Sequence, residues 1–378
     1  MEFADELVRF AKGFEFISTH REFNSSGLLM RSVESGEMLS LWFKSPEDSA
    51  GAAALCPRCP VVVLDGEDGF GGIATWSTTH VALLAKAGGL KTWVATGYRN
   101  QVQAAVERVE ASAGSSIAGS SPAYDTNGVA DLGGAGGVDR EVLLSCGAGV
   151  LTSYPFGNPM EGLTDQTGVP VLPLQEYLEP HPLGRAEYIL LMGWLAGTGH
   201  TARTAFAEIE AAYRGLCEEG RQLAHIARPV VFSGSVDAGV WHAPGPNSFA
   251  AQLIRDAGAT YLLDGVEVAK GKSGNVQVDL EQMLMLSSEA DFWGKVVHAP
   301  SGWTRADAQQ ELPWLDFDRI GSFHCNTAQA DYFTQAVVEP HLMLADLLYI
   351  FHPSIRADAN STPFQPAYFQ STRNSSRP

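Results

Sequence analysis

The stretch that decides the fold is Pro182–Pro229, PLGRAEYILLMGWLAGTGHTARTAFAEIEAAYRGLCEEGRQLAHIARP, in which no proline interrupts the chain between its two ends. We predict a first helical segment over Leu183–Ala196 and a longer helix over Thr201–Ala227, with Thr201 as its N-cap. At 1.5 Å per residue the longer helix would measure about 40 Å, which suits a rigid connection between two larger parts of the chain. The prediction rests on apolar residues that recur at the three- and four-residue spacing of an amphipathic helix: Phe206, Ile209, Ala212, Tyr213, Leu216, Leu223 and Ile226.

The composition limits the classes of partner. The chain has 378 residues, of which 45% are hydrophobic and 18% charged, and its formal net charge is −18. This length allows two or three domains. The negative charge argues against nucleic acid and against an anionic membrane surface, both of which attract basic proteins. No apolar run approaches the roughly 18 residues of a transmembrane helix, and the first residues lack the apolar core of a signal peptide.

On both sides of the central stretch, apolar segments of strand length alternate with helical patterns, which predicts an α/β fold. We expect an N-terminal α/β lobe with a strand extension over 1–182, linking helices over 183–228, a C-terminal α/β lobe over 229–353 and a disordered tail over 354–378. The Gly/Ser/Ala-rich segment 112–137 is expected to be a loop or mobile insert. Strands are expected at 14–17, 38–43, 61–64, 92–96, 149–152, 169–174, 230–233, 260–263, 291–293 and 320–323, and helices at 81–87, 138–144, 249–257, 278–286 and 340–351.

Two submotifs occur in the same order on the two sides of the central stretch. The segment from His80 to Gly89, followed by a strand, corresponds to the segment from Phe249 to Gly258, also followed by a strand. Later, Val138-Asp-Arg-Glu141 corresponds to Val278-Asp-Leu-Glu281. Helix–strand units of unrelated α/β proteins look alike, so either match alone would be weak. Two matches in one order indicate two similar α/β lobes joined by one long rigid helix, with a ligand cleft between the lobes.

The motifs resemble those of one family, the ABC-transporter substrate-binding proteins that have a helical backbone and bind cobalamin or ferric siderophores. Within it, the sequence is most similar to bacterial vitamin-B12-binding proteins and to algal cobalamin-acquisition proteins. The likeness extends over about residues 60–353 and is carried by Trp76-Ser-Thr-Thr-His80, both Val-Asp-x-Glu copies, Glu176-Tyr-Leu-Glu-Pro-His-Pro-Leu-Gly-Arg-Ala-Glu187, Trp241-His-Ala-Pro-Gly-Pro-Asn-Ser248, Asp331-Tyr-Phe333, Pro340-His-Leu-Met-Leu-Ala-Asp-Leu347 and His352-Pro353.

The resemblance implies a clamp of two lobes with little hinge motion, which binds cobalamin or a similar chelate and has no catalytic cofactor. It also implies that Glu141 and Glu281 dock onto a membrane permease or uptake receptor. The sequence departs from the B12 binders at Gly133–Gly137 and Asn275, where they carry tryptophan, and at Gln335, where they carry arginine. The ligand-binding residues expected from the resemblance and from loop placement are Trp76, Thr78, Tyr98, Tyr154, Phe156, Trp241, Asn275, Asp331, Tyr332 and Phe333.

A corrin ring is a broad apolar disc rimmed by amides, so flat aromatic side chains in loops suit it. For each single aromatic, packing in the core is about as common as ligand contact. The acidic balance favours a neutral or cationic ligand over a polyanionic siderophore. We therefore expect a monomeric, non-enzymatic, extracytoplasmic binding protein for cobalamin. The alternatives are a ferric-siderophore, haem or metal-ion binding protein of the same fold, or a nitrogenase-like enzyme.

Metal and thiol chemistry have weaker support in the sequence. No metal-binding motif is present, and His80, His181, His242 and His324 are expected to be scattered over loops, so no metal site is predicted. Cys56 and Cys59 form one CxxC before a strand, for which a loop disulfide or free thiols are favoured over redox or metal chemistry. Catalysis is not expected, because no nucleophile elbow or phosphate loop is present.

Overall fold

The structure is a computed structural model, and it describes residues 2–3, 8–18, 25–49, 57–64, 71–102, 128–155, 160, 162–353 and 364–372. The chain forms two compact units. Unit 1 comprises Met1–Glu179 and Leu183–Phe206, and unit 2 comprises Pro180–Pro182 and Ala207–Pro378. Within the described part of the chain, no helix is both long and apolar enough to cross a membrane.

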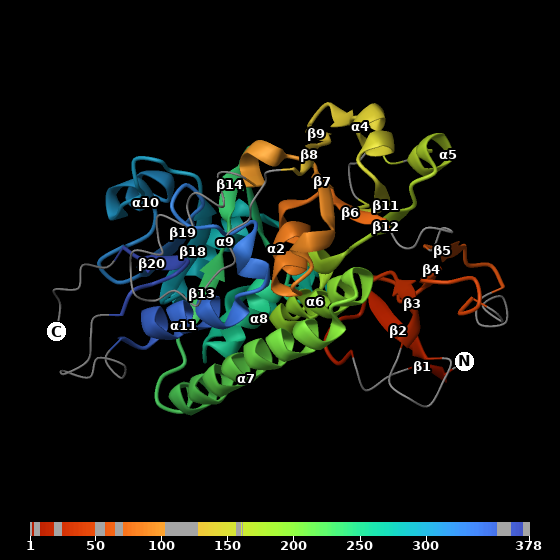
Figure 1. Cartoon of the computed structure of the whole chain (residues 1–378). Helices are drawn as coiled ribbons and strands as arrows, with labels where there is room; N and C mark the ends of the chain where they lie inside the picture. Colours follow the sequence, from red (N-terminus) through yellow and green to blue (C-terminus); the bar gives the residue numbers. More distant parts are fainter. Residues whose placement is uncertain are drawn as a thin grey trace. The chain divides into compact units, whose positions relative to one another are not determined.

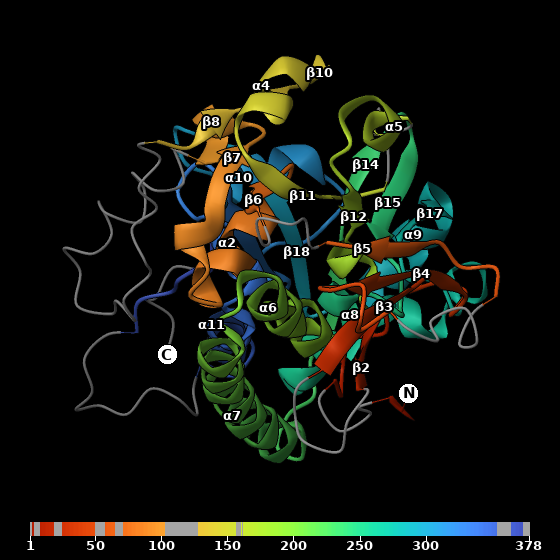
Figure 2. The same ribbon diagram turned by 45° about the vertical axis from the view of Figure 1, so that its right-hand side comes forward.

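Unit 1 begins with a five-stranded sheet that the sequence predicted only in part. Its strands lie in chain order, and each neighbouring pair is antiparallel except the last, which is parallel. Figure 2 shows β2, β3 and β4 side by side in red and orange. Alternating apolar residues such as Ile17, Leu29 and Leu41 are fully buried on one side of the sheet. The strands are β1 (Glu2–Phe3), β2 (Phe14–Ser18), β3 (Ser25–Arg31), β4 (Met38–Phe43) and β5 (Val61–Val63).

A second, parallel sheet forms the rest of unit 1, with the strand order β12-β11-β6-β7-β8. A small antiparallel ribbon of two strands, β9 (Gly133–Gly134) and β10 (Gly137–Val138), precedes the helix α4. The parallel strands are β6 (Gly72–Thr75), β7 (Trp93–Thr96), β8 (Ala130–Asp131), β11 (Ala148–Ser153) and β12 (Val171–Pro173), and the helices of this region are α2 (Thr78–Lys86), α4 (Arg140–Ser145) and α5 (Leu163–Thr167).

Unit 2 has a corresponding sheet with the strand order β16-β13-β18-β19-β20, in which only the pairing of β20 is antiparallel. A three-stranded antiparallel sheet in the order β14-β15-β17 follows β13. The strands are β13 (Val230–Ser233), β14 (Ser235–Asp237), β15 (Val240–Pro244), β16 (Thr260–Tyr261), β17 (Asn275–Asp279), β18 (Phe292–Val297), β19 (Gly321–Asn326) and β20 (Phe369–Ser371), and the helices are α8 (Phe249–Asp256), α9 (Leu280–Leu286), α10 (Arg305–Glu311) and α11 (Pro340–Phe351).

The two parallel sheets share one connectivity, which confirms the predicted duplication. Leaving aside the short edge strand β8, in each unit the first strand, β6 or β13, lies between the second strand, β7 or β16, and the third, β11 or β18. The fourth strand, β12 or β19, lies outside the third. Helices α2 and α8 connect the first strand to the second in their units, as the first repeated submotif predicted.

The second submotif also folds alike in both units. Asp139 caps α4 by accepting hydrogen bonds from the backbone N–H groups of Glu141 and Val142, at 3.0 and 3.1 Å. Asp279 caps α9 in the same way, at 2.9 Å to Glu281 and 3.2 Å to Gln282. An aspartate at this position satisfies N–H groups that the first helical turn leaves without partners.

The two long central helices are α6 (Pro182–Ala196) and α7 (Gly199–Ala224), and both are visible in Figure 1 in green. The helix α7 runs from unit 1 into unit 2, because the boundary between the units falls after Phe206. The predicted boundaries were wrong at both ends: α7 begins before Thr201, which is therefore not its N-cap, and it ends before Ile226, which is 71% exposed. Ala212 is exposed as well.

Two buried glutamates fasten the start of the chain to α6 and the turn before it. Glu187 accepts hydrogen bonds from the backbone N–H groups of residues 9, 10 and 11, at 2.7–2.8 Å. Glu179 accepts from the N–H groups of Lys12 and Gly13 and from the Tyr188 hydroxyl. Burial raises the pKa of Glu187 and raises that of Glu179 to about 7. The N-terminal sheet is thus joined to the rest of unit 1 by specific polar contacts.

The expected disordered tail was partly wrong. Residues 369–371 form β20, which pairs with β19 through Cys325 and Phe369 among others. The carboxylate of Asp346, on α11, accepts hydrogen bonds from the backbone N–H groups of residues 367, 368 and 369 at 2.7–3.1 Å. The remainder of the predicted tail, 354–363 and 373–378, lies outside the described residues, as does most of the segment 112–137.

Candidate functional site

An aromatic cluster occupies the carboxyl edge of the parallel sheet in unit 1. Trp76 follows β6, Tyr98 follows β7 and Tyr154 follows β11, so each lies at the end of one of three adjacent strands. The ring centroids of Trp76 and Tyr98 are 5.4 Å apart. In open α/β sheets the carboxyl edge, where the strand order changes direction, is the usual place for a ligand. The sequence predicted all three residues as ligand contacts.

Trp76 differs from the expectation, because its side chain is only 1% exposed and belongs to the core cluster of unit 1. Tyr98 and Tyr154 are half-buried and pack against the same cluster. Burial raises the pKa of Tyr154 to about 12, with a further contribution from the Tyr98 hydroxyl. The side chains of Tyr98 and Tyr154 are therefore partly accessible at the edge of the sheet, whereas the Trp76 ring is packed in the core.

The backbone around Tyr98 is held in an uncommon conformation. Its φ is 52°, in the left-handed region that side chains other than glycine seldom adopt. Its N–H donates to the carbonyl of Gly133 at 2.7 Å. The preceding residue is Gly97, where an added Cβ would lie 2.5 Å from the Trp76 ring. Such a strained position, maintained by close packing, is a common mark of a functional site.

We therefore expect Gly97→Ala to lower the free energy of unfolding by about 1–3 kcal/mol, because the new methyl group overlaps the indole. Chemical denaturation measures the change. Gly136→Ala is a matched control in the same unit, since no heavy atom lies within 4 Å of its added Cβ. Equal stability of the two variants would contradict the close packing of Gly97 on Trp76.

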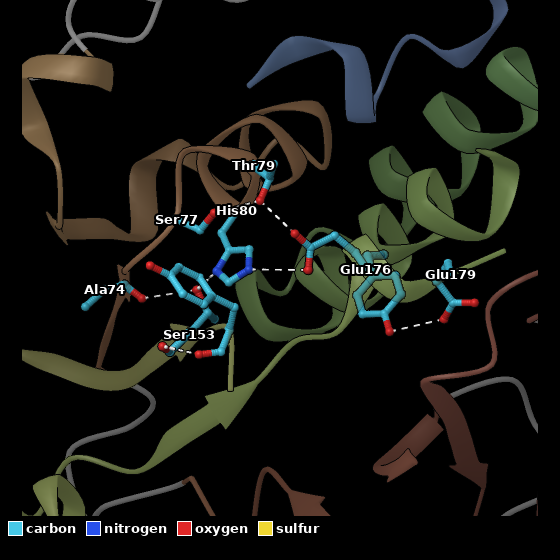
Figure 3. Close-up of polar contacts among 10 residues, drawn as sticks. Ala74, Ser77, Thr79, His80, Ser153, Glu176 and Glu179 are labelled. Carbon is cyan, nitrogen blue, oxygen red and sulfur yellow. Dashed lines mark hydrogen bonds and ion pairs between the residues drawn. The ribbon is translucent and has the colours of Figure 1, made fainter. Parts of the chain in front are cut away.

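A buried polar network lies beside this cluster, and Figure 3 shows its members. His80, the third residue of α2, is fully buried, and its Nδ1 lies 3.1 Å from the Thr152 hydroxyl. Its Nε2 lies 3.6 Å from Oε2 of Glu176, which is itself 2% exposed. The other carboxylate oxygen of Glu176 accepts a hydrogen bond from the Thr79 hydroxyl at 2.7 Å. The network thus joins α2, β11 and the turn before α6.

The charge of Glu176 is stabilised by this arrangement. Burial by itself opposes ionisation of Glu176, but the nearby imidazole of His80, the hydrogen bond from the Thr79 hydroxyl and the charge of Arg185 together lower the pKa of Glu176 to about 2. The carboxylate is therefore ionised at neutral pH although it is buried. His80 and Glu176 lie in two of the motifs that support the family resemblance, but we predicted no role for either residue and expected His80 in a loop. A buried contact between a histidine and a glutamate in distant segments leaves no periodic signal that could have revealed it.

In unit 2, the prediction that Trp241 lies in a loop was wrong. Trp241 is the second residue of β15, is 1% exposed, and donates from its indole to the carbonyl of Ser233 at 3.2 Å. Its ring centroid lies 5.6 Å from that of Phe232. The sequence missed β14, β15 and β17, so the alternation that buries Trp241 and exposes part of His242 was not recognised. Trp241 is a core residue of unit 2.

The other predicted contacts in unit 2 are exposed or half-buried, although one carboxylate oxygen of Asp331 is buried. Phe333 is 62% exposed, and its ring lies 5.3 Å from that of Tyr332, which is half-buried. Asp331 accepts a hydrogen bond from the backbone N–H of Thr334 at 3.2 Å and so stabilises the turn that carries both aromatic residues. Asn275 is exposed at the start of β17, and its amide lies 3.4 Å from Nδ1 of His242.

The remaining predicted residues are placed as follows. Thr78 is the half-buried first residue of α2, and Phe156 lies outside the described residues. Cys59 is disulfide-bonded, in agreement with one of the two favoured alternatives, whereas Cys56 is not among the described residues. His242 and His324 lie in β15 and β19, not in loops. In the described part of the chain, no three His, Cys, Asp or Glu side chains come together as a metal site would require.

Comparison with known proteins agrees with this architecture. The sequence matches no protein-family model and no curated protein. Among solved structures, the chain is similar to a periplasmic haem-binding protein from Pseudomonas aeruginosa, with a TM-score of 0.55 and 15% identity over 80% of this chain and 98% of that one.

Two further solved structures are similar to the chain. An ABC-transporter substrate-binding protein from Listeria monocytogenes matches with a TM-score of 0.52 and 10% identity, over 75% of this chain and 99% of that one. A periplasmic binding protein from Veillonella parvula matches with a TM-score of 0.52 and 14% identity, over 75% and 91% respectively. The chain therefore has the two-lobed α/β fold of the periplasmic solute-binding proteins, with two parallel sheets and one long connecting helix.

Proposed function

We propose that this chain is an extracytoplasmic binding protein that captures cobalamin, or a similar large metal chelate, for uptake. The observation that carries the proposal is the cluster of Trp76, Tyr98 and Tyr154 at the carboxyl edge of the parallel sheet in unit 1. A corrin is a wide, flat and mostly apolar ligand, and half-buried aromatic rings at such an edge suit it. The net charge of −18 supports a ligand without much negative charge.

In unit 2, Asn275, Asp331, Tyr332 and Phe333 are proposed as further ligand contacts. Phe333 supports this, because its large exposed ring follows the carboxyl end of β19. Trp76 and Trp241 support the site from within the cores of their own units.

Delivery of the ligand is proposed to involve a membrane permease or an uptake receptor that contacts Glu141 and Glu281, with the binding protein acting as a monomer. Both glutamates are exposed, and each follows the capping aspartate of its helix by two residues. Each helix also exposes an apolar side chain, Leu144 on α4 at 59% and Met285 on α9 at 77%. Equivalent helices in the two units would thus offer the same kind of contact to a partner.

Haem is the second candidate ligand, and the structural similarity to a haem-binding protein favours it. Haem is also flat and apolar, but its edge carries two carboxylates where cobalamin carries amides. The aromatic cluster alone suits either ring. The distinction therefore depends on the polar groups around the cluster and on direct measurement.

The proposal predicts saturable binding of cyanocobalamin by the purified chain at micromolar or lower concentration. Isothermal calorimetry and quenching of tryptophan fluorescence measure it, with haemin and ferrioxamine B titrated in parallel. Hexaamminecobalt(III) is the control, since it carries cobalt and positive charge but no ring. The absence of cyanocobalamin binding at micromolar ligand would exclude the cobalamin proposal, and saturable binding of haemin alone would replace it with haem.

A further inference from the structure

The strand β20 lies outside the region of the family resemblance, and the proposed function does not use it. It pairs with β19 in the sheet of unit 2 (Figure 1). The backbone N–H groups of residues 367, 368 and 369 donate to the carboxylate of Asp346 on α11. These bonds fix the positions of Tyr368 and Phe369, whose side chains are both buried.

Phe369 contacts the beginning of the segment Asp331–Glu339, which leads from β19 to α11. Its ring centroid lies 6.3 Å from that of Tyr332 and 5.9 Å from that of Phe323 in β19. Both contacts are edge-to-face and lie within the usual range for aromatic pairs. The ring of Tyr332 in turn contacts that of Phe333. Phe369 therefore packs on the turn that carries two of the proposed ligand contacts.

Tyr368 contacts the end of the same segment. Its hydroxyl donates a hydrogen bond to the carboxylate of Glu339, the residue directly before α11. Burial raises the pKa of Tyr368 well above its ordinary value, and the carboxylate of Glu339 adds to this effect. The phenol therefore keeps its proton and remains a donor at physiological pH. Two consecutive residues, Tyr368 and Phe369, thus hold the segment Asp331–Glu339 at both of its ends.

The hydrogen bonds inside the turn are local. The N–H of Thr334 donates to the carboxylate of Asp331 at 3.2 Å, and the N–H of Gln335 donates to the Asp331 carbonyl at 3.1 Å. Such bonds determine the shape of a turn but not its position against the sheet. The position depends on packing, and the contact of Tyr332 with Phe369 supplies it.

We propose that β20 positions the ligand-contact turn Asp331–Phe333 of unit 2, with Phe369 and Tyr368 as the positioning residues. This inference rests on the proposed function, in which the turn contacts the chelate. An aromatic side chain that is held in place before the ligand binds loses less entropy on binding. The segment after α11 therefore acts on ligand binding through the turn.

The test is Phe369→Leu, which keeps an apolar side chain against Phe323 and removes the ring that contacts Tyr332. Hydrogen exchange measured by mass spectrometry should become about tenfold faster over residues 331–339 and should not change in β19, because the turn opens locally. Calorimetry with cyanocobalamin, haemin and ferrioxamine B should show about three- to tenfold weaker binding of whichever ligand the wild-type chain binds.

A second variant and a matched control complete the test. Tyr368→Phe keeps the ring and removes the hydrogen bond to Glu339, so it should produce the same two effects to a smaller extent. Phe364→Leu is the control, because it makes the same substitution in the same C-terminal segment. The ring of Phe364 stacks on Tyr349 of α11, at 4.6 Å between centroids. This control should change neither the exchange over residues 331–339 nor ligand binding.

The outcomes separate this inference from the proposed function. If exchange over residues 331–339 is unchanged in Phe369→Leu, or rises equally in β19, the positioning role is overturned and the proposed function stands. If exchange rises over 331–339 alone but binding keeps its wild-type strength, the turn is not a ligand contact, and the inference is overturned while the contacts proposed in unit 1 stand. If none of the three ligands binds the wild-type chain, the proposed function fails and the binding role of β20 fails with it. Faster exchange confined to 331–339, with weaker binding and no effect of Phe364→Leu, supports the inference.

Discussion

Replacing Trp241 with alanine is expected to lower the free energy of unfolding of unit 2 by about 3–5 kcal/mol. The side chain is 1% exposed, donates a hydrogen bond to the carbonyl of Ser233 and lies against Phe232. Its removal leaves a large cavity where the three-stranded sheet β14-β15-β17 meets β13, and the neighbouring strands cannot fill it. Thermal and denaturant unfolding followed by circular dichroism measure the loss.

Trp314→Ala is the control for Trp241→Ala, because it removes the same side chain from a position that is 39% exposed. We expect this variant to lose much less stability, about 1 kcal/mol or less. If Trp241→Ala instead weakened ligand binding while unfolding at the wild-type temperature, Trp241 would be a surface contact, as the sequence first suggested, and its position in β15 would be wrong.

The second large effect is expected for His80→Ala, at about 3–5 kcal/mol of unfolding free energy. The substitution leaves the carboxylate of Glu176 buried and without the imidazole that lies 3.6 Å away. The double variant His80→Ala/Glu176→Gln should be more stable than His80→Ala alone, because it removes the stranded charge. A double variant less stable than either single variant would contradict the contact between His80 and Glu176 as the main interaction.

The same pair predicts a pH dependence whose sign follows from Glu176. Its pKa is about 2 in the folded chain against an ordinary value of 4.5, so the unfolded chain binds the proton more readily. The stability that the carboxylate contributes is present above pH 4.5 and is lost as the pH falls from 4.5 towards 2. At about 1.4 kcal/mol per pKa unit, the loss is about 3 kcal/mol.

The comparison of wild type with Glu176→Gln isolates the contribution of Glu176 to the pH dependence of stability. The raised pKa values of Glu179 and Asp346, about 7 and 6, act in the opposite direction, since their protonated forms favour the folded state at low pH. The contributions of Glu179 and Asp346 are the same in the wild type and in Glu176→Gln. The difference in stability between these two proteins should therefore shrink below pH 4.5. A difference that stays constant from pH 6 to 3 would contradict the assignment to Glu176.

Much of the fold could be predicted because its signals are local and periodic. The strands β13 and β4 and the helix α11 lie where apolar patterns placed them, and the repeated Val-Asp-x-Glu motif marked two helices with the same cap. The long helix was also recognised from its spacing. Its start was missed because Gly199 was interpreted as part of an interruption, although the helix begins at this residue.

The site could be predicted less well, for physical reasons. Sequence shows that an aromatic residue follows a strand, but exposure depends on which neighbouring strands cover it. Trp241 pairs with Val278 of β17, a strand that was not predicted, and its ring packs against Phe232. The pairing of His80 with Glu176 joins residues 97 positions apart, with Thr79 bonded to the same carboxylate. Such contacts are determined by tertiary packing, and the spacing of residues along the sequence does not reveal them.

The last described strand, β20, has a consequence for how this chain can be cut or extended. Without β20 the backbone of β19 would present open N–H and C=O groups along the border of the sheet, and a fully buried strand of the sequence Gly321–Asn326 is the kind that recruits a strand from a second molecule. Asp346 holds this protective strand by three backbone hydrogen bonds. Shortening the chain before residue 364 would therefore favour self-association, and a fusion partner is better placed after residue 372.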